Sequence, residues 1–309
     1  MGHDHGHSHG LTGGTATGRH RRKLAAVVVI TLLGVVAQLI GAAVSGSLAL
    51  LADAGHMLSD AAGVGIALLA AWVATRPATN KRTFGWQRAE VLAALANATA
   101  LVVIAVVITI EAIGRFGETA TVAPTPMLVA ACIGLAANLA SLGILHSGRK
   151  ASLNLRGAYL EVLGDTLGSL AVIAAAIVIA LTGSPLADPI ASLAIAAMIL
   201  PRAWSLMREV VDVLLEATPR HVDLDTVREH IISIDGVVDV HDLHAWTITS
   251  GVPVLSAHIV LDADHFSATR ADEVLDALTG CLGSHFDTEH CTFQLEPAEH
   301  TRHEHPTHD

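Results

Sequence analysis

Long apolar stretches, almost free of charge, are the feature that most constrains how this chain can fold. Residues 24–52 contain no Asp, Glu, Lys or Arg over 29 consecutive positions, and Ser45-Gly46-Ser47 offers a turn inside that stretch. A helix needs roughly 20 apolar residues to cross the hydrocarbon of a bilayer. The pattern predicts an all-α bundle of six transmembrane helices, at residues 24–44, 48–74, 88–114, 127–147, 157–182 and 185–206.

The charge of the chain divides just after the sixth predicted span. Residues 1–207 carry 13 Lys and Arg against 9 Asp and Glu, and residues 208–309 carry 5 against 20, so the two balances of +4 and −15 give the net charge of −11. Only 15% of the residues are charged, whereas about 25% is usual in a soluble domain. This division predicts a membrane domain joined to an acidic soluble domain. It also argues against a nucleic-acid-binding protein, which needs positive charge.

Basic residues mark one side of the predicted spans. They precede the first span and occupy the connections between the second and third spans and between the fourth and fifth. Arg202 and Arg208 lie at the end of the sixth span. In the other three connections, Arg115 is the single basic residue. Because basic loops stay in the cytoplasm, both termini are expected there, in a plasma (inner) membrane. No cleaved signal peptide is expected. Three cysteines without a CxxC pair fit a reducing compartment.

Acidic and imidazole side chains lie four residues apart in two of the predicted spans. His56 and Asp60 are in the second span, and Glu161 and Asp165 are in the fifth. Residues four apart project from one helix face, and ionisable groups at membrane depth are costly unless they have a function. At about 1.5 Å per residue, Asp60 and Asp165 fall at nearly the same depth. The pairs predict a tetrahedral divalent-metal site. The alternative is a set of buried hydrogen bonds between helices.

A small α+β domain is predicted after residue 208. Its elements alternate as helix, strand, strand, helix and strand, at residues 222–234, 237–250, 252–262, 267–282 and 290–296. This order suits an open sheet with helices on one face. Neighbouring strands could gather its imidazole and carboxylate groups, which suit Zn²⁺. The candidate ligands are His241, His244, His258, His290 and Glu296.

Histidines also cluster at both ends of the chain. Four lie in the first ten residues and four in the last ten. We expect residues 1–23 and 298–309 to be disordered tails that hold metal loosely. The sequence contains no His-Glu-x-x-His motif, which argues against an intramembrane metalloprotease, and we expect no catalytic residues and no enzymatic activity.

Five segments together resemble the cation diffusion facilitator family of the zinc-exporting type, over residues 20 to 297. They are SGSLALLADAGHMLSD (45–60), RTFGWQRAEVLAALANA (82–98), RGAYLEVLGDTLGSL (156–170), VHDLHAWTITSG (240–251) and LSAHIVLD (255–262). The resemblance implies a transmembrane domain at 24–207 and a metallochaperone-like cytoplasmic domain at 208–297 that binds metal and dimerises. It implies a homodimeric antiporter that exports Zn²⁺ in exchange for H⁺, with a further, regulatory Zn²⁺ in the cytoplasmic domain.

The resemblance also implies roles for particular residues. His56, Asp60 and Asp165 match the family's intramembrane metal ligands, and His241, His258, His290 and Glu296 match its cytoplasmic metal site. Glu161 departs from the pattern, because zinc-type members usually have His there. A hard oxygen at this position leaves Mn²⁺, Fe²⁺, Co²⁺ or Cd²⁺ open as the main substrate. A membrane metal sensor without transport and a passive channel are the rival functions.

Overall fold

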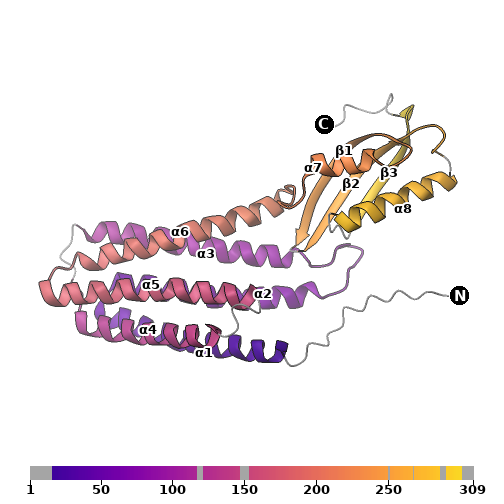
Figure 1. Cartoon of the computed structure of the whole chain (residues 1–309). Helices are drawn as coiled ribbons and strands as arrows, with labels where there is room; N and C mark the ends of the chain where they lie inside the picture. The colour runs from indigo at the N-terminus through magenta and orange to yellow at the C-terminus, as the bar shows by residue number, and fades with distance from the viewer. Residues whose placement is uncertain are drawn as a thin grey trace. The chain divides into compact units, whose positions relative to one another are not determined.

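The computed structural model describes residues 16–116, 121–146, 153–249, 251–266, 268–285 and 290–300. The predicted histidine-rich tails lie largely outside these residues. The described residues form two compact units, one of residues up to Ile66 together with Ala96–Ser205, the other of Ala67–Leu95 together with the residues from Leu206 onward. The first unit holds most of the long apolar helices, and the second holds the three-stranded sheet (Figure 1).

Six long helices make up the N-terminal part of the chain. Each contains a segment long and apolar enough to cross a membrane, which confirms the predicted spans and makes this a multi-pass membrane protein. Their bounds are α1 (Ala16–Ser45), α2 (Leu48–Ala74), α3 (Ala89–Arg115), α4 (Pro124–His146), α5 (Leu153–Thr182) and α6 (Ala187–Leu214).

Helix α6 differs from its predicted span, because it continues past residue 206 to Leu214. Four of the eight added residues, Met207, Arg208, Glu209 and Leu214, are good helix formers, and the hydrogen-bonded backbone does not need to stop where the apolar composition stops. The boundary predicted between the two domains at 207 and 208 therefore falls within a helix. Arg202, which composition placed at the end of a span, lies well inside α6.

Small side chains allow the helices to pack closely. The buried core draws on all six helices and is rich in alanine, including Ala49, Ala131 and Ala176. A methyl group added to Gly41 of α1 would collide with Ala130 of α4, and one added to Gly134 of α4 would collide with the Gln38 side chain. Such close approach is typical of helices in membranes, where van der Waals packing drives association.

One buried carboxylate ties three helices together. Asp188, at the start of α6, accepts hydrogen bonds from the backbone N–H groups of Leu48 (2.8 Å) and Ala49 (3.2 Å) and from the Ser47 hydroxyl (2.5 Å). Arg115, at the end of α3, pairs with the same carboxylate at 3.2 Å. The first N–H groups of a helix have no partner within the helix. Asp188 therefore caps α2 from another helix.

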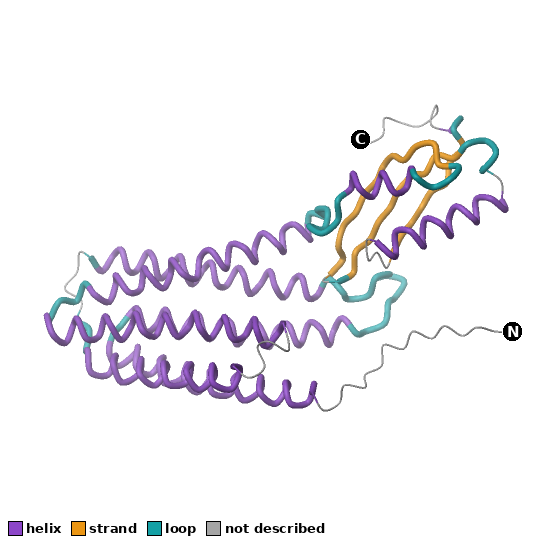
Figure 2. The backbone as a smooth tube through the Cα atoms, viewed as in Figure 1, coloured by secondary structure: helices purple, strands orange, loops and turns teal. Residues whose placement is uncertain are grey.

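The C-terminal elements follow the predicted order. They are α7 (Leu224–Ile232), β1 (Val237–Thr249), β2 (Val252–Leu261), α8 (Ala268–His285) and β3 (His290–Pro297). The sheet has the order β1-β2-β3, with β2 antiparallel to β1 and parallel to β3. Helix α8 forms the crossover that a parallel pair of strands requires (Figure 2).

Both short helices cover the same face of the sheet. Val227 and Ile231 of α7 share one core cluster with Leu278 of α8 and with the alternate β2 residues Leu255, Ala257, Ile259 and Leu261. Successive side chains of a strand point to opposite faces. His258 of β2 and Glu296 of β3 alternate with core residues, so they lie on the face of the sheet opposite to the one that packs against α7 and α8.

Candidate metal centres

Three candidate ligands from two helices meet inside the helical bundle. His56 Nε2 lies 3.4 Å from Asp60 Oδ2 and 3.5 Å from Asp165 Oδ1. His56 and Asp60 are one turn apart on α2, and Asp165 comes from α5. One ligand atom from each residue lies within 4.8 Å of the other two, which is close enough for all three to hold one metal ion.

The carboxylate oxygens in this group have an unusual environment. Asp60 Oδ2 and Asp165 Oδ1 are buried, and neither accepts a hydrogen bond from any residue that the structure describes. These are the same oxygens that face His56 Nε2. A buried acceptor without a partner costs about 1–3 kcal/mol, and more when it is charged. A network that existed only for hydrogen bonding would satisfy them, so the arrangement favours a cation site.

Glu161, the fourth residue predicted for this site, is not one of the three. Its Oε1 lies 2.9 Å from Nη2 of Arg202, on α6. Nη1 of the same arginine lies 3.7 Å from Asp60 Oδ2. Sequence reasoning used Arg202 only as a marker of the cytoplasmic side. The available signal was that the helical pattern continues beyond Arg202, which places this arginine inside a helix and not at its end.

A polar network one turn away fixes the helices that carry the ligands. Asp53 of α2 accepts hydrogen bonds from Gln38 Nε2 of α1 (2.7 Å) and from Ser169 Oγ of α5 (3.0 Å). Asn138 Nδ2 of α4 in turn donates to Ser169 Oγ at 3.3 Å. Asp53 precedes His56 by three residues and Ser169 follows Asp165 by four, so the network holds α2 and α5 in register beside the candidate ligands.

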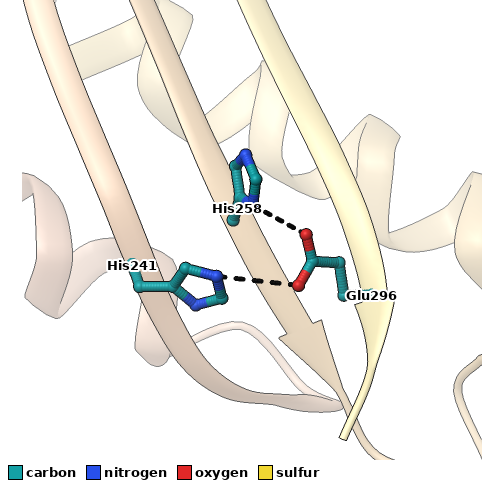
Figure 3. A group of neighbouring side chains, drawn as sticks. All are labelled: His241, His258 and Glu296. Carbon is teal, nitrogen blue, oxygen red and sulfur yellow. Dashed lines mark ion pairs between the residues drawn. The ribbon is translucent and has the colours of Figure 1, made fainter. Parts of the chain in front are cut away.

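A second group of candidate ligands lies on the face of the sheet opposite α7 and α8. His258 Nδ1 is 2.7 Å from Glu296 Oε1, and His241 Nε2 is 3.6 Å from Glu296 Oε2 (Figure 3). Glu296 is only 2% exposed, and Gln294 donates a hydrogen bond to its Oε1 at 2.6 Å. Among the described residues, Glu296 Oε2 has no hydrogen-bond partner. Two imidazoles and a carboxylate form a donor set that suits Zn²⁺.

Strand register explains why these three residues meet. His241 of β1 is directly opposite His258 of β2, and Glu296 of β3 pairs with Val260, two residues further along β2. A bulge between His241 and His244, at which Asp242 has a φ of 46°, shifts the register by one residue. His244 therefore lies opposite Ser256, but its side chain is exposed and outside the group of three.

His290, also predicted for the cytoplasmic site, lies elsewhere on the strand. It is the first residue of β3 and pairs with Val254, six positions before Glu296. Six residues of extended strand span about 20 Å. The His290 ring instead packs edge-on against the Phe84 ring, with the centroids 6.3 Å apart. Within the described residues, the predicted candidates that lie outside the groups of three are thus Glu161, His244 and His290.

The chain matches known proteins over nearly its whole length. Two family models match, the cation efflux transmembrane domain over residues 24–215 and the cation efflux protein cytoplasmic domain over residues 219–298. The chain is 42% identical to the metal cation efflux system protein CzcD of Cupriavidus metallidurans over 293 residues, which cover 95% of this chain and 90% of that protein.

Two further relatives are similar over nearly their whole length. The cadmium, cobalt and zinc/H(+)-K(+) antiporter of Bacillus velezensis is 39% identical over 97% of this chain and 93% of its own. The zinc transporter ZitB of Escherichia coli is 40% identical over 94% of this chain and 92% of its own. Six spans, a cytoplasmic α+β domain and two family matches agree: the chain belongs to the cation diffusion facilitator family, whose members export metal cations.

Proposed function

We propose that this protein exports divalent metal cations, with Zn²⁺ as the main substrate, from the cytoplasm in exchange for protons. The observation that carries the proposal is the convergence of His56, Asp60 and Asp165 at membrane depth, with carboxylate oxygens that accept no hydrogen bond from the described residues. One imidazole nitrogen and two carboxylate oxygens are common ligands of Zn²⁺. The relatives are named as a metal cation efflux protein, a zinc transporter, and a cadmium, cobalt and zinc/H(+)-K(+) antiporter, and these names support the same class of substrate.

Glu161 is proposed as the fourth ligand of the transported ion. It lies one helical turn before Asp165 on α5, so a change of its rotamer could direct its carboxylate toward the ion. A site with one nitrogen and three oxygens is harder than one with two imidazoles. Mn²⁺, Fe²⁺, Co²⁺ or Cd²⁺ as the preferred substrate is therefore the alternative within the same transporter class.

Proton exchange follows from the chemistry of these ligands. A metal ion binds neutral imidazole and ionised carboxylates, so loading requires His56 Nε2, Asp60 and Asp165 to be free of protons. Protonation of His56 Nε2 or of a carboxylate, from the more acidic side, removes a lone pair or a negative charge from the ion and expels it. Movement of the helices relative to one another then changes the side from which the site is reached.

The cytoplasmic group is proposed as a regulatory metal site. His241, His258 and Glu296 would hold the ion, and the buried Glu296 oxygen that accepts no hydrogen bond from the described residues is the observation that supports this. His290 remains a further candidate from the sequence. Binding can regulate transport only if one transport state holds the ion better than another. We further propose a homodimer formed through this domain, in the inner membrane, with both termini cytoplasmic and no enzymatic activity.

Transport against a gradient tests the proposal. Purified protein is reconstituted into vesicles with an acidic lumen, and Zn²⁺ is added only to the outside. We expect an enclosed fluorescent indicator to report accumulation above the external concentration, and we expect Asp60→Ala and Asp165→Ala to abolish it while the proteins remain monodisperse. Zn²⁺ flux that only equilibrates would indicate a channel. Absence of flux would indicate a sensor, and full transport by either variant would refute the site.

A further inference from the structure

One cationic side chain reaches the intramembrane ligands. The guanidinium of Arg202, on α6, lies 2.9 Å from Glu161 Oε1 and 3.7 Å from Asp60 Oδ2. It thereby bridges carboxylates from α5 and α2. The Arg202 side chain is 48% exposed, whereas that of Asp60 is 11% exposed, so the arginine contacts the group from its edge.

The arginine and a bound metal ion would use the same oxygen. Asp60 Oδ2 faces Arg202 Nη1 on one side and His56 Nε2, 3.4 Å away, on the other. A zinc ion would lie about 2.0–2.2 Å from a carboxylate oxygen that binds it. It would therefore bring two positive charges within a few ångströms of the guanidinium. Repulsion between them is strong where the effective dielectric constant is low.

The charge of the group explains what the arginine supplies. Asp60, Glu161 and Asp165 carry three negative charges when ionised, and His56 carries none when it is neutral. Uncompensated charge at membrane depth is costly, and partners usually neutralise it. Without a metal ion, Arg202 is the basic side chain that forms ion pairs with these carboxylates in the described part of the chain.

We propose that Arg202 is a tethered counter-cation that exchanges with the transported metal ion on Asp60 and Glu161. When the ion leaves, the guanidinium neutralises the two carboxylates, and an arriving ion must displace it. Arg202 thereby lowers the affinity of the site and speeds release. The inference rests on the proposed function, because it requires that the ion bound at this site is the one transported.

The identity of residue 161 agrees with this role. A guanidinium forms strong, charge-assisted hydrogen bonds with a carboxylate. A histidine at this position would offer no negative charge, and when protonated it would repel the arginine. At position 161 this chain has Glu where zinc-type members of the family usually have His. This glutamate is therefore the residue that can hold Arg202, with Oε1 2.9 Å from Arg202 Nη2.

The test is the concentration dependence of Zn²⁺ transport by the full chain in proteoliposomes. Arg202→Gln removes the competing charge, so we expect the half-saturating Zn²⁺ concentration to fall by about tenfold or more. We expect the maximal rate to fall as well, because the ion is released more slowly. Arg202→Lys keeps the charge and should stay close to the wild type. Arg208→Gln removes an equal charge six positions further along the chain and should change neither parameter.

The opposite result is well defined. An arginine that only braces the helices would leave the half-saturating concentration unchanged, or raise it, in Arg202→Gln, and either result overturns the inference. If Arg202→Gln does not fold, Arg202→Met, which keeps much of the apolar stem, is measured instead with the same expectation.

Failure of the inference and failure of the proposed function give different results. If the wild type does not accumulate Zn²⁺, or if Asp165→Ala transports normally, the proposed function is wrong. If the wild type accumulates Zn²⁺ and requires Asp165, but Arg202→Gln keeps the wild-type half-saturating concentration, only the counter-cation role of Arg202 is wrong.

Discussion

His56 Nε2 lies 3.5 Å from Asp165 Oδ1, although 109 positions separate the two residues and they belong to different helices. Asp60, one turn from His56, completes the group at 3.4 Å from the same nitrogen. The carboxylate oxygens that face the imidazole accept no hydrogen bond within the described ranges. This relationship turns two separate sequence pairs into one candidate site, and it underlies the proposed transport of divalent metal ions.

The residue at position 161 should influence which metal is transported. Glu161→His replaces a hard oxygen with a borderline nitrogen, so the preference for Zn²⁺ over Mn²⁺ is expected to rise. Competition between the two metals for uptake into proteoliposomes measures this preference. Glu111→Gln, an acidic-to-neutral change at an exposed position of α3, is the control and should leave it unchanged. An unaltered preference in Glu161→His would mean that residue 161 does not select the metal.

Close packing of α1 on α4 can be tested with two glycines of one helix. An added methyl at Gly134 collides with Gln38, which donates a hydrogen bond to Asp53, so Gly134→Ala should destabilise the protein by about 1–3 kcal/mol. Gly143 also lies on α4, and no described atom comes within 4 Å of its added methyl. Gly143→Ala should be neutral or slightly stabilising, because alanine favours helix. Thermal unfolding in detergent compares them. Equal midpoints would contradict the packing argument.

The cap that Asp188 provides should matter for stability. Asp188 Oδ2 accepts hydrogen bonds from Leu48 N at 2.8 Å and from Arg115 Nη1 at 3.2 Å. In Asp188→Asn, an NH₂ group at this position would face these N–H donors and could accept neither bond. We expect a loss of about 2–3 kcal/mol. Asp212→Asn removes an exposed carboxylate from the same helix, where an ion pair with Arg220 contributes little, and serves as the control. The midpoint of thermal unfolding should fall clearly only in Asp188→Asn; a matching fall in Asp212→Asn would count against the cap.

Metal binding to the cytoplasmic group should be visible as added stability. A ligand that binds only the folded protein at 100 times its Kd stabilises it by about 2.7 kcal/mol. Zn²⁺ should therefore raise the unfolding midpoint of the full chain, and a chelator should reverse the rise. Glu296→Gln should lose much of it, because the buried carboxylate is shared by His241 and His258. His244→Ala, at an exposed position outside the group, should retain it. Equal rises in both variants would exclude Glu296 as a ligand.

Local periodicity determined much of this protein. Six apolar stretches specify six spans, because crossing a bilayer depends on length and composition alone. The alternation of core residues in β2 specifies which face of the sheet His258 occupies, and the spacing of His56 and Asp60 places them on one helix face. Each of these features depends on residues that are close together in the sequence, so it can be predicted from the sequence alone.

Contacts between distant segments were decided only by the tertiary structure. Asp188 caps a helix 140 residues earlier, and Arg202 of α6 pairs with Glu161 of α5. His290 and Glu296 share one face of β3, yet six residues of extended chain keep them apart. The strand register instead places Glu296 beside His241 and His258. Residue spacing specifies a face, but packing and register determine which faces meet, and the energy of those contacts depends on the whole fold.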